Sequence, residues 1–276
     1  MKGRRKRVAI LVATALLTAA PAARSAGPPP DADHAKAALA ASSRHGEWVD
    51  LGLPGDGKLV TWVVYPETRE KAGAVIVIHE IFGLTDWVRG VADQLAKDGF
   101  IALAPDLLSG LGPKGGGTDS LGEDVTKTIR NLTPAAVAAR LDAVRDYALK
   151  IPAASGKVAC IGFCWGGAAS FAYAVQQPKL DAAVVYYGTS PDDAADYAKI
   201  SAPILGLYGG DDARVGATIP AAEAGMKKLG KRYTVRIYDG AGHGFLRQQT
   251  GRDGANLKAS EKAWGETLAF LREFLR

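Results

Sequence analysis

Residues 158–170, VACIGFCWGGAAS, decide the fold of this 276-residue chain. They begin as a short apolar run typical of a buried strand and end as an alanine-rich segment typical of a helix. Between the two lies Gly-Phe-Cys-Trp-Gly, the G-x-C-x-G form of a nucleophile elbow, with cysteine in the place of serine. We therefore expect Cys164 to be a nucleophile presented on a tight turn between a strand and a helix.

The elbow pattern has a physical reason. A strand that turns at once into a helix forces its central residue into a strained backbone conformation. Side chains two positions to either side would collide with the neighbouring strand and helix, so Gly162 and Gly166 stand there. The thiol of Cys164 then projects from the top of the sheet. The N–H of Trp165 points toward the place where an oxyanion would form, and the dipole of the new helix adds partial positive charge.

Strand-type and helix-type segments alternate along the rest of the chain, without an internal repeat. A continuous apolar run such as residues 74–78 indicates a strand covered by helices on both faces. We therefore expect one α/β domain with the α/β-hydrolase fold, a doubly wound, mostly parallel sheet with helices on both faces. The expected strands are 47–50 and 58–65, joined as a hairpin at the antiparallel edge, then 74–78, 100–104, the strand before Cys164, 182–187, 204–208 and 233–238; the expected helices are 87–98, 134–149, the segment after Cys164, 220–229 and 259–275.

The first 22 residues have the three parts of a secretory signal peptide. A basic segment is followed by an apolar run over 8–17 and by a small-x-small site, Ala-Pro-Ala, over 20–22. The apolar run is too short to anchor the chain stably in a bilayer, so we expect cleavage near Ala22 and no membrane span afterwards. The predicted organisation is a signal peptide over 1–22, a disordered Ala- and Pro-rich linker over 23–44, and a single domain over 45–276.

The signal predicts an exported, periplasmic protein that uses the general secretory route. Arg4 and Arg5 raise the alternative of twin-arginine export. Lys6, Arg7 and Val8 follow that pair, however, where the twin-arginine motif requires apolar residues, so general secretion is the preferred interpretation.

Charge, cysteine content and motifs exclude several classes of protein. The formal net charge is +5, and removal of the basic signal segment leaves a mature chain near zero, so no nucleic-acid partner is indicated. Cys160 and Cys164 lie too far apart along an extended segment for a disulfide, so we expect both to be free, with Cys160 in the core. Metal-binding motifs are missing, so we expect neither a metal nor another cofactor. We expect a monomer that acts on a small molecule.

A glycine-rich segment follows the expected strand 100–104. Residues 107–119 contain three consecutive glycines, which raises the alternative of a phosphate-binding loop. No Gly-Lys-Ser/Thr follows, and no strand feeds directly into a helix there, so we interpret the segment as a mobile loop at the mouth of the site.

A thiol is a useful nucleophile only as the thiolate, so Cys164 needs a base, and that base needs an orienting acid. In this fold the acid and the histidine follow the nucleophile, at the ends of later strands. His243, flanked by glycines after strand 233–238, is the expected base. Strand 204–208 ends in Gly-Gly-Asp-Asp, so the position alone leaves Asp211 and Asp212 open as the acid.

Further blocks of sequence resemble one family, the dienelactone hydrolases. The resemblance covers about Trp48 to the C-terminus, and the Glu-Ile-Phe-Gly block together with a cysteine elbow is specific to this family. The matching blocks, in order, are HEIFG over 79–83, APDL over 104–107, GFCWGG over 162–167, YYG over 186–188, GGDDARV over 209–215 and AGHGF over 241–245.

The resemblance implies a Cys-His-Asp triad of Cys164, His243 and Asp212. The family acid stands three residues before a valine, and Val215 selects Asp212. With this assignment, Asp211 is a turn or capping residue.

The resemblance also implies roles for the loop that follows strand 74–78. Glu80 would contact the resting thiol and move when substrate arrives, helping to generate the thiolate. The N–H groups of Ile81 and Trp165 would form the oxyanion hole. Independently, a carboxylate at the mouth of an apolar pocket should have a raised pKa and could accept a proton, although a helix-cap or surface role for Glu80 is the alternative.

Family members that open dienelactone hold the carboxylate of the substrate with two arginines. Arg247 stands at one position, four residues after the catalytic histidine, but residues 108–110 supply no arginine at the other. Arg214 could compensate through a paired donor geometry, or could be a solvated surface residue. We expect Arg247, Arg214 and Phe245 to contact the substrate, and the incomplete clamp leaves the exact substrate open.

The expected activity is hydrolysis of a small ester or enol-lactone through a thioester acyl-enzyme on Cys164, as in a carboxymethylenebutenolidase-like carboxylic ester hydrolase. A hydrolase of the same fold that acts on a neutral ester or thioester is the nearer alternative. A non-catalytic exported protein whose thiol binds ligands or senses oxidants is the more distant one.

Overall fold

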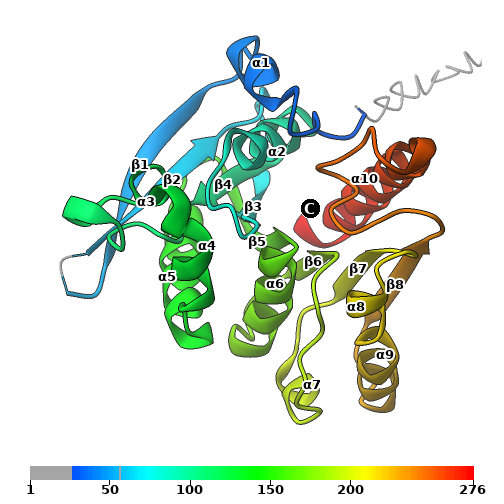
Figure 1. Cartoon of the computed structure of the whole chain (residues 1–276). Coiled ribbons are helices and arrows are strands. Elements are labelled where there is room, and N and C mark those ends of the chain that lie inside the picture. Colours follow the sequence, from blue (N-terminus) through cyan, green and yellow to red (C-terminus); the bar gives the residue numbers. More distant parts are fainter. Residues whose placement is uncertain (1–26, 56) are drawn as a thin grey trace, which may run out of the picture.

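A computed structural model describes residues 27–55 and 57–276 (Figure 1). Within these residues eight strands form one sheet, in the order β1-β2-β4-β3-β5-β6-β7-β8. The β1–β2 and β2–β4 pairs are antiparallel, and the other pairs are parallel. The strands are β1 (Gly46–Leu53), β2 (Gly57–Val64), β3 (Ala72–Ile78), β4 (Ile101–Pro105), β5 (Ala154–Phe163), β6 (Ala182–Tyr186), β7 (Ile204–Gly209) and β8 (Tyr233–Tyr238).

Helices cover both faces of this sheet (Figure 1). One face packs against α5 (Pro134–Ala148), α6 (Trp165–Gln176), α7 (Asp196–Lys199) and α9 (Ile219–Lys228), and the opposite face packs against α2 (Asp86–Lys97) and α10 (Ala255–Leu275). The shorter helices are α1 (Ala35–Ala40), α3 (Thr118–Leu121), α4 (Val125–Arg130) and α8 (Ala213–Gly216), with 3-10 turns η1 (Pro113–Gly115), η2 (Gly122–Asp124) and η3 (Arg252–Gly254).

Strand β3 explains why the sheet must be covered on both sides. All seven of its residues are buried. Ile76 and Ile78 contribute to the core on the α5 and α6 side, whereas Val75 and Val77 contribute to the core on the α2 and α10 side. The doubly wound α/β-hydrolase architecture expected from the sequence is therefore confirmed. No helix in the described ranges is long and apolar enough to cross a bilayer.

The segment before β1 differs from the disordered linker expected over 23–44. Residues 23–26 and the expected signal peptide lie outside the described residues. Residues 27–44, in contrast, contain α1 and pack on the domain, with Asp31 and Ala35 buried. The Ala- and Pro-rich composition cannot build a core of its own, but tertiary contacts with α2 and with the loop around Arg247 supply the burial that composition alone does not reveal.

The segment between β4 and α5 is attached to the domain through Asp106. The Asp106 carboxylate accepts hydrogen bonds of 2.7 Å from both the N–H and the hydroxyl of Thr118. The Thr118 hydroxyl oxygen also accepts a 3.0 Å hydrogen bond from the N–H of Leu84. The glycine-rich loop that we expected at the mouth of the site is thereby joined to the loop that follows β3.

Candidate active site

Cys164 occupies the turn between β5 and α6 with φ 55° and ψ −115°, a costly conformation for a residue with a side chain. Its N–H donates a 3.1 Å hydrogen bond to the Tyr186 carbonyl. A Cβ added to Gly162 would lie 1.8 Å from the Gly166 carbonyl oxygen, and one added to Gly166 would lie 2.3 Å from the His79 carbonyl oxygen. The turn therefore requires glycine at both positions, as the sequence pattern predicts.

The first turn of α6 packs against the carboxyl end of β3, because of the close approach of Gly166. Trp165 consequently lies beside the loop that holds Ile81, and its ring stacks on the His79 ring with centroids 5.6 Å apart. Within the described part of the chain, neither the Ile81 nor the Trp165 N–H donates to a backbone oxygen. The Trp165 N–H, at the positive end of the α6 dipole, instead acts on the Cys164 thiol and lowers its pKa.

The structure pairs His243 with Asp212. His243 follows β8, Asp212 follows β7, and Nδ1 of the histidine lies 2.5 Å from Oδ2 of the aspartate. The Asp212 side chain is 7% exposed, whereas Asp211 is half exposed and pairs with Arg252 at 2.8 Å. Of the two acids left open by chain position, the buried one therefore orients the imidazole.

The imidazole and the thiol of Cys164 lie in the same site but make no hydrogen bond within the described residues. The Tyr187 ring packs edge-on against the His243 ring, with centroids 5.3 Å apart. The Asp212 charge raises the pKa of the thiol and the Arg214 charge lowers it. Any direct proton exchange with His243 therefore requires a rotation of the thiol or of the ring, as is common in unliganded active sites.

Glu80 is a buried carboxylate whose charge acts on the Cys164 thiol, although no hydrogen bond joins the two side chains within the described residues. It lies at the carboxyl end of β3 and is 3% exposed, with Oε2 2.8 Å from Nε of Arg247. Burial raises the pKa of Glu80 to about 7, against the opposing effect of the Arg247 charge. Glu80 can therefore take up or release a proton near neutral pH.

Burial and a neighbouring negative charge also keep the thiol of Cys164 protonated. Burial, followed by the negative charge of Glu80, raises the pKa of Cys164. The Trp165 N–H and the Arg214 charge act in the opposite direction but do not reverse the shift. Ionised Glu80 is therefore an acceptor placed next to a thiol that holds its proton.

Arg214 and Phe245, both expected to contact the substrate, differ in their exposure to solvent. Arg214 lies exposed on α8, near enough to influence the thiol. Phe245, in contrast, is fully buried, and its ring packs against the rings of Tyr186, Tyr187 and Tyr238. The prediction that Phe245 contacts substrate is wrong, because the loop after β8 turns this side chain inward and makes it part of the core beneath the site.

Sequence reasoning missed two residues at the site. His79 is fully buried, and its Nδ1 lies 2.8 Å from the Glu80 carbonyl oxygen, so Nδ1–H donates to it and fixes the peptide that precedes Ile81. Burial lowers the pKa of His79, which keeps the ring neutral. Tyr187 has φ 39° and a buried hydroxyl without a hydrogen-bond partner in the described residues. Its position directly after β6, one strand from the elbow, was the available signal.

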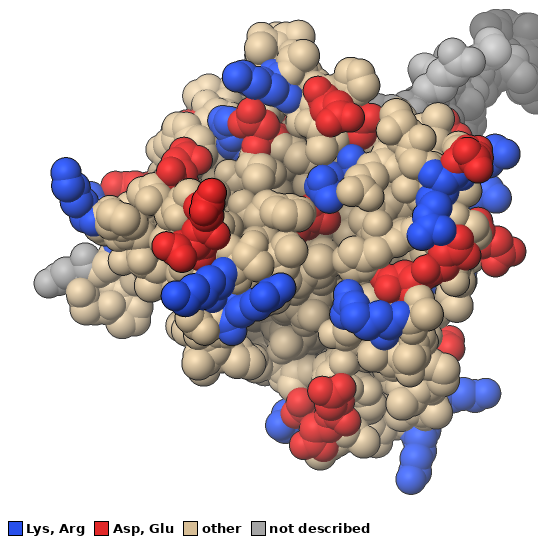
Figure 2. Space-filling view, in the orientation of Figure 1, with Lys and Arg blue, Asp and Glu red and all other residues tan. Residues whose placement is uncertain are grey.

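Charged side chains of both signs are mixed on the surface around the site. Acidic and basic side chains are interspersed over the face seen in Figure 2, without one broad area of either sign. A charged substrate group would therefore be selected by individual residues such as Arg247 and not by a general field.

Comparison with known proteins identifies the family to which the chain belongs. The model of the dienelactone hydrolase family matches residues 59–275. A Saccharolobus solfataricus protein described as "Putative carboxymethylenebutenolidase" is 30% identical over 255 residues, which cover 81% of this chain and 97% of that protein. A Bradyrhizobium protein described as "Probable 2-oxo-3-(5-oxofuran-2-ylidene)propanoate lactonase" is 30% identical, with 82% of this chain and 93% of that protein covered.

A solved structure supports the fold assignment. A crystal structure described as a "Putative Dienelactone Hydrolase" from Klebsiella pneumoniae superposes with a TM-score of 0.74 at 23% identity, covering 84% of this chain and all of that one. The family match spans the elbow, the loop after β3 and both strands that carry the acid and the histidine. The chain is therefore a carboxylic ester hydrolase that belongs to the dienelactone hydrolase family.

Proposed function

We propose that the chain hydrolyses a small carboxylic ester or enol-lactone, with Cys164 as nucleophile, His243 as acid–base group and Asp212 as its orienting partner. The observation that carries the proposal is the 2.5 Å pair between His243 and Asp212 at the sheet edge where the strained elbow presents the thiol. The parallel strands β5, β7 and β8 end on the same side of the sheet, which supports a site shared by the residues that follow them.

Acylation begins with ionisation of the thiol. The Cys164 proton passes to Glu80, whose pKa of about 7 suits a proton acceptor at neutral pH. The thiolate adds to the carbonyl carbon, and the N–H groups of Ile81 and Trp165 stabilise the oxyanion. His243 takes this proton from Glu80 and donates it to the leaving oxygen as the carbon–oxygen bond breaks. The net proton transfer is therefore from the sulfur of Cys164 to the leaving oxygen.

In deacylation His243 acts first as a base and then as a proton donor. His243, held by Asp212, takes a proton from water, and the resulting hydroxide attacks the thioester carbonyl. Collapse of the second tetrahedral intermediate releases the acid and the thiolate, which recovers its proton from His243. The same oxyanion donors serve both steps.

Arg247 supports a preference for a carboxylate-bearing substrate. Its ion pair with Glu80 uses Nε, which leaves the terminal guanidinium nitrogens for a carboxylate. A substrate carboxylate on Arg247 would weaken the hold of Arg247 on Glu80 and so raise the pKa of Glu80, which favours proton uptake from the thiol. In this proposal Arg247 alone, without the family's second arginine, binds the substrate carboxylate, and exposed Arg214 adds a further positive charge.

The decisive experiment traps the acyl group. Incubation with an ester or lactone, acid quenching and mass spectrometry should find one acyl adduct, on the peptide that contains Cys164. Cys164→Ala should lower kcat/KM by at least about 10³-fold, since a nucleophile is lost, and Cys160→Ala serves as the matched loss of a thiol. Full activity of Cys164→Ala would refute the mechanism, and thiol reactivity without turnover would favour a ligand-binding or oxidant-sensing protein.

The two adjacent acids provide a second test. Asp212→Asn should lower kcat by about 10²- to 10⁴-fold, because an amide no longer holds the imidazole in the required tautomer. Asp211→Asn changes the same chemistry one residue away, on an exposed ion pair, and should change kcat less than about twofold. Equal losses in both variants would remove Asp212 from the proposed triad.

A neutral ester remains the second candidate substrate class, because residues 108–110 supply no arginine at the second position of the family's carboxylate clamp. Comparing kcat/KM for carboxylated and uncharged lactones, in the wild type and in Arg247→Ala, separates the two. Loss of discrimination in the variant supports a carboxylated substrate, whereas unchanged ratios support a neutral one. Secretory export, cleavage near Ala22 and a monomeric state stay predictions, which N-terminal sequencing of periplasmic protein and light scattering would test.

A further inference from the structure

The segment 27–44 crosses the domain beside the candidate active site, and we call it the N-terminal strap. It lies outside the family match, which begins at residue 59. Its contacts are nevertheless specific: Asp31 and Ala35 are buried, and Pro30 and Ala35 pack over Gly90 of α2. A segment held this closely beside a catalytic site can shape the site.

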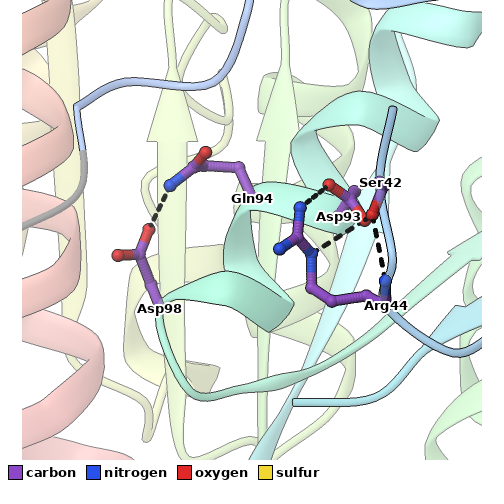
Figure 3. Close-up of polar contacts among 5 residues, drawn as sticks. All are labelled: Ser42, Arg44, Asp93, Gln94 and Asp98. Atoms are coloured by element: carbon purple, nitrogen blue, oxygen red, sulfur yellow. Dashed lines mark hydrogen bonds and ion pairs between the residues drawn. The ribbon is translucent and has the colours of Figure 1, made fainter. Parts of the chain in front are cut away.

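One end of the strap is fastened to α2. Figure 3 shows Ser42 and Arg44 converging on the Asp93 carboxylate. The Ser42 hydroxyl donates at 2.6 Å, and the Arg44 guanidinium donates with Nε at 2.9 Å and also with Nη2. Arg44 and Asp93 are less than 20% exposed, so this paired contact is more than a surface ion pair.

The other end is fastened to the loop that carries Arg247. The Ala32 N–H donates a 3.0 Å hydrogen bond to the Arg247 carbonyl. The buried Gln249 side chain donates through Nε2 to the carbonyls of Pro29, at 2.8 Å, and Leu246, at 3.0 Å. The strap and the Arg247 loop therefore share a backbone contact and a buried side-chain contact.

A small cavity lies against the strap and reaches Arg247, the partner of Glu80. Its volume is about 340 Å³. The Arg247 guanidinium lies 5.0 Å over the Phe82 ring at this cavity, and the methyl group of Ala32 closes it from the strap side. Its lining residues are Ala32, Phe82, Thr85, Asp86, Trp87 and Arg247.

We propose that this cavity is a specificity subsite in which the strap, through Ala32, limits the size of the substrate group bound beside Arg247. The inference rests on the proposed function and deepens it. The cavity offers the flat Phe82 ring, the Arg247 guanidinium and the small side chain of Ala32, and the charge of its one acidic lining residue, Asp86, is paired with Arg89. These groups together suit a short, flat, carboxylate-bearing chain. Because Arg247 pairs with Glu80, whose charge acts on the Cys164 thiol, the subsite would take the part of the substrate remote from the reacting carbonyl.

The test is an Ala→Leu pair on the strap. Ala32→Leu fills the subsite, whereas Ala37→Leu makes the same change on the exposed face of α1. Activity is measured with 4-nitrophenyl hydrogen glutarate, whose acyl chain ends in a carboxylate, and with 4-nitrophenyl acetate, which is too short to enter the subsite. Ala32→Leu should lower kcat/KM for the glutarate ester about tenfold or more, through KM, and change the acetate ester less than about twofold.

Ala37→Leu should change neither ester. Equal effects of Ala32→Leu on both esters, or no effect on either, would overturn the inference while the proposed function stands. Failure of the wild type to hydrolyse either ester would instead overturn the proposed function. Circular dichroism and thermal melting establish that each variant is folded.

A second variant keeps the inference testable if Ala32→Leu does not fold. Asp93→Asn loosens the α2 end of the strap without new bulk, at a residue that does not line the cavity. It should raise KM for the glutarate ester about two- to fivefold and leave the acetate ester unchanged, because a loosened strap no longer holds Ala32 at the subsite. An unchanged KM for the glutarate ester in a folded Asp93→Asn protein would count against the strap.

Discussion

Cys160 and Cys164 lie four residues apart in one stretch of chain, and their surroundings differ in nearly every respect. Cys160 is inside β5, fully buried, with its sulfur 3.1 Å from the Ser170 hydroxyl. Burial raises its pKa to about 12. Cys164 follows the end of the same strand, partly exposed, at a positive φ and at the first turn of α6.

The comparison teaches that position on the sheet, and not residue type, makes a thiol chemically useful. The pKa of both thiols is raised, so neither is a thiolate in the resting protein. Of the two thiols, Cys164 is the one whose pKa is raised by the Glu80 charge and lowered by the Trp165 N–H. In the proposed mechanism, Cys164 therefore differs from Cys160 in having access to a group that can remove its proton.

The largest expected difference between the two thiols is their rate of alkylation. Iodoacetamide should modify Cys164 in the native protein at least about 10³-fold faster than Cys160, because the solvent reaches Cys160 only when the centre of the sheet unfolds. The rate at Cys164 should rise with pH, since its raised pKa keeps the thiol protonated at neutral pH.

Peptide mapping by mass spectrometry after timed quenching measures both rates. In Cys164→Ala, native protein should take up no label until denaturant is added. Comparable native-state rates at both positions would contradict the burial of β5.

The second prediction concerns a substitution that disrupts the turn at Cys164 without changing the interior of β5. A methyl group at Gly166 would lie 2.3 Å from the His79 carbonyl oxygen and 2.5 Å from that of Ile78, both backbone atoms that cannot swing away. Gly166→Ala should therefore cost about 3 kcal/mol or more of unfolding free energy and abolish fast alkylation of Cys164.

Gly265→Ala, on α10 where no atom lies within 4 Å of an added Cβ, is the matched control. It should be neutral or slightly stabilising, because alanine favours a helix. Chemical denaturation measures both variants, and a native-like stability for Gly166→Ala would mean that the turn is looser than its contacts indicate.

The elbow was accessible from sequence because its constraints are local. Gly162, Cys164 and Gly166 belong to one turn, and each apolar run that became a strand carries its own signal of burial. The choice between Asp211 and Asp212 needed either the resemblance or the structure, because both acids follow β7 and only their burial separates them.

What sequence could not supply depends on contacts between distant segments. The strap was expected to be disordered, because its composition lacks a core, yet Gln249 and Asp93 hold it from 220 and 51 residues away. Phe245 was expected at the substrate because it neighbours His243 in sequence, but the direction of its side chain is set by the aromatic cluster beneath the site. Neither local pattern nor composition contains that information.

The third prediction concerns the carboxylate that only Cys164 has beside it. The folded-state pKa of Glu80, about 7, lies above the ordinary value of 4.5, so the native state holds this proton more tightly than the unfolded chain. The resulting stability is present below about pH 4.5 and is lost as pH rises through 7. Glu80→Gln, a neutral substitute, should therefore raise the unfolding free energy by about 1–3 kcal/mol at pH 8 and by little at pH 4.5.

The same variant should lose activity, because an amide cannot accept the thiol proton. In the wild type, kcat/KM should fall as pH drops below about 7, where Glu80 becomes protonated. Denaturation curves at pH 4.5 and 8 and a pH–rate profile measure these effects. A Glu80→Gln protein that is less stable at pH 8 would mean that the pair with Arg247 outweighs the cost of burying the charge.

The smallest expected effect concerns Cys160 itself. Cys160→Ala removes one buried sulfur and its contact with the Ser170 hydroxyl, and should cost about 1–2 kcal/mol through a small cavity. Cys160→Ser keeps a hydrogen-bonding partner for Ser170 at the price of a more polar buried atom, so it should be of similar stability. Both variants should retain wild-type kcat, because the Ser170 hydroxyl also donates to Val184 at 3.0 Å and keeps α6 in place against β6. A tenfold loss of kcat in either variant would mean that the interior of β5 sets the position of the elbow more tightly than its glycines do. The environments of Cys160 and Cys164 would then not be independent of each other.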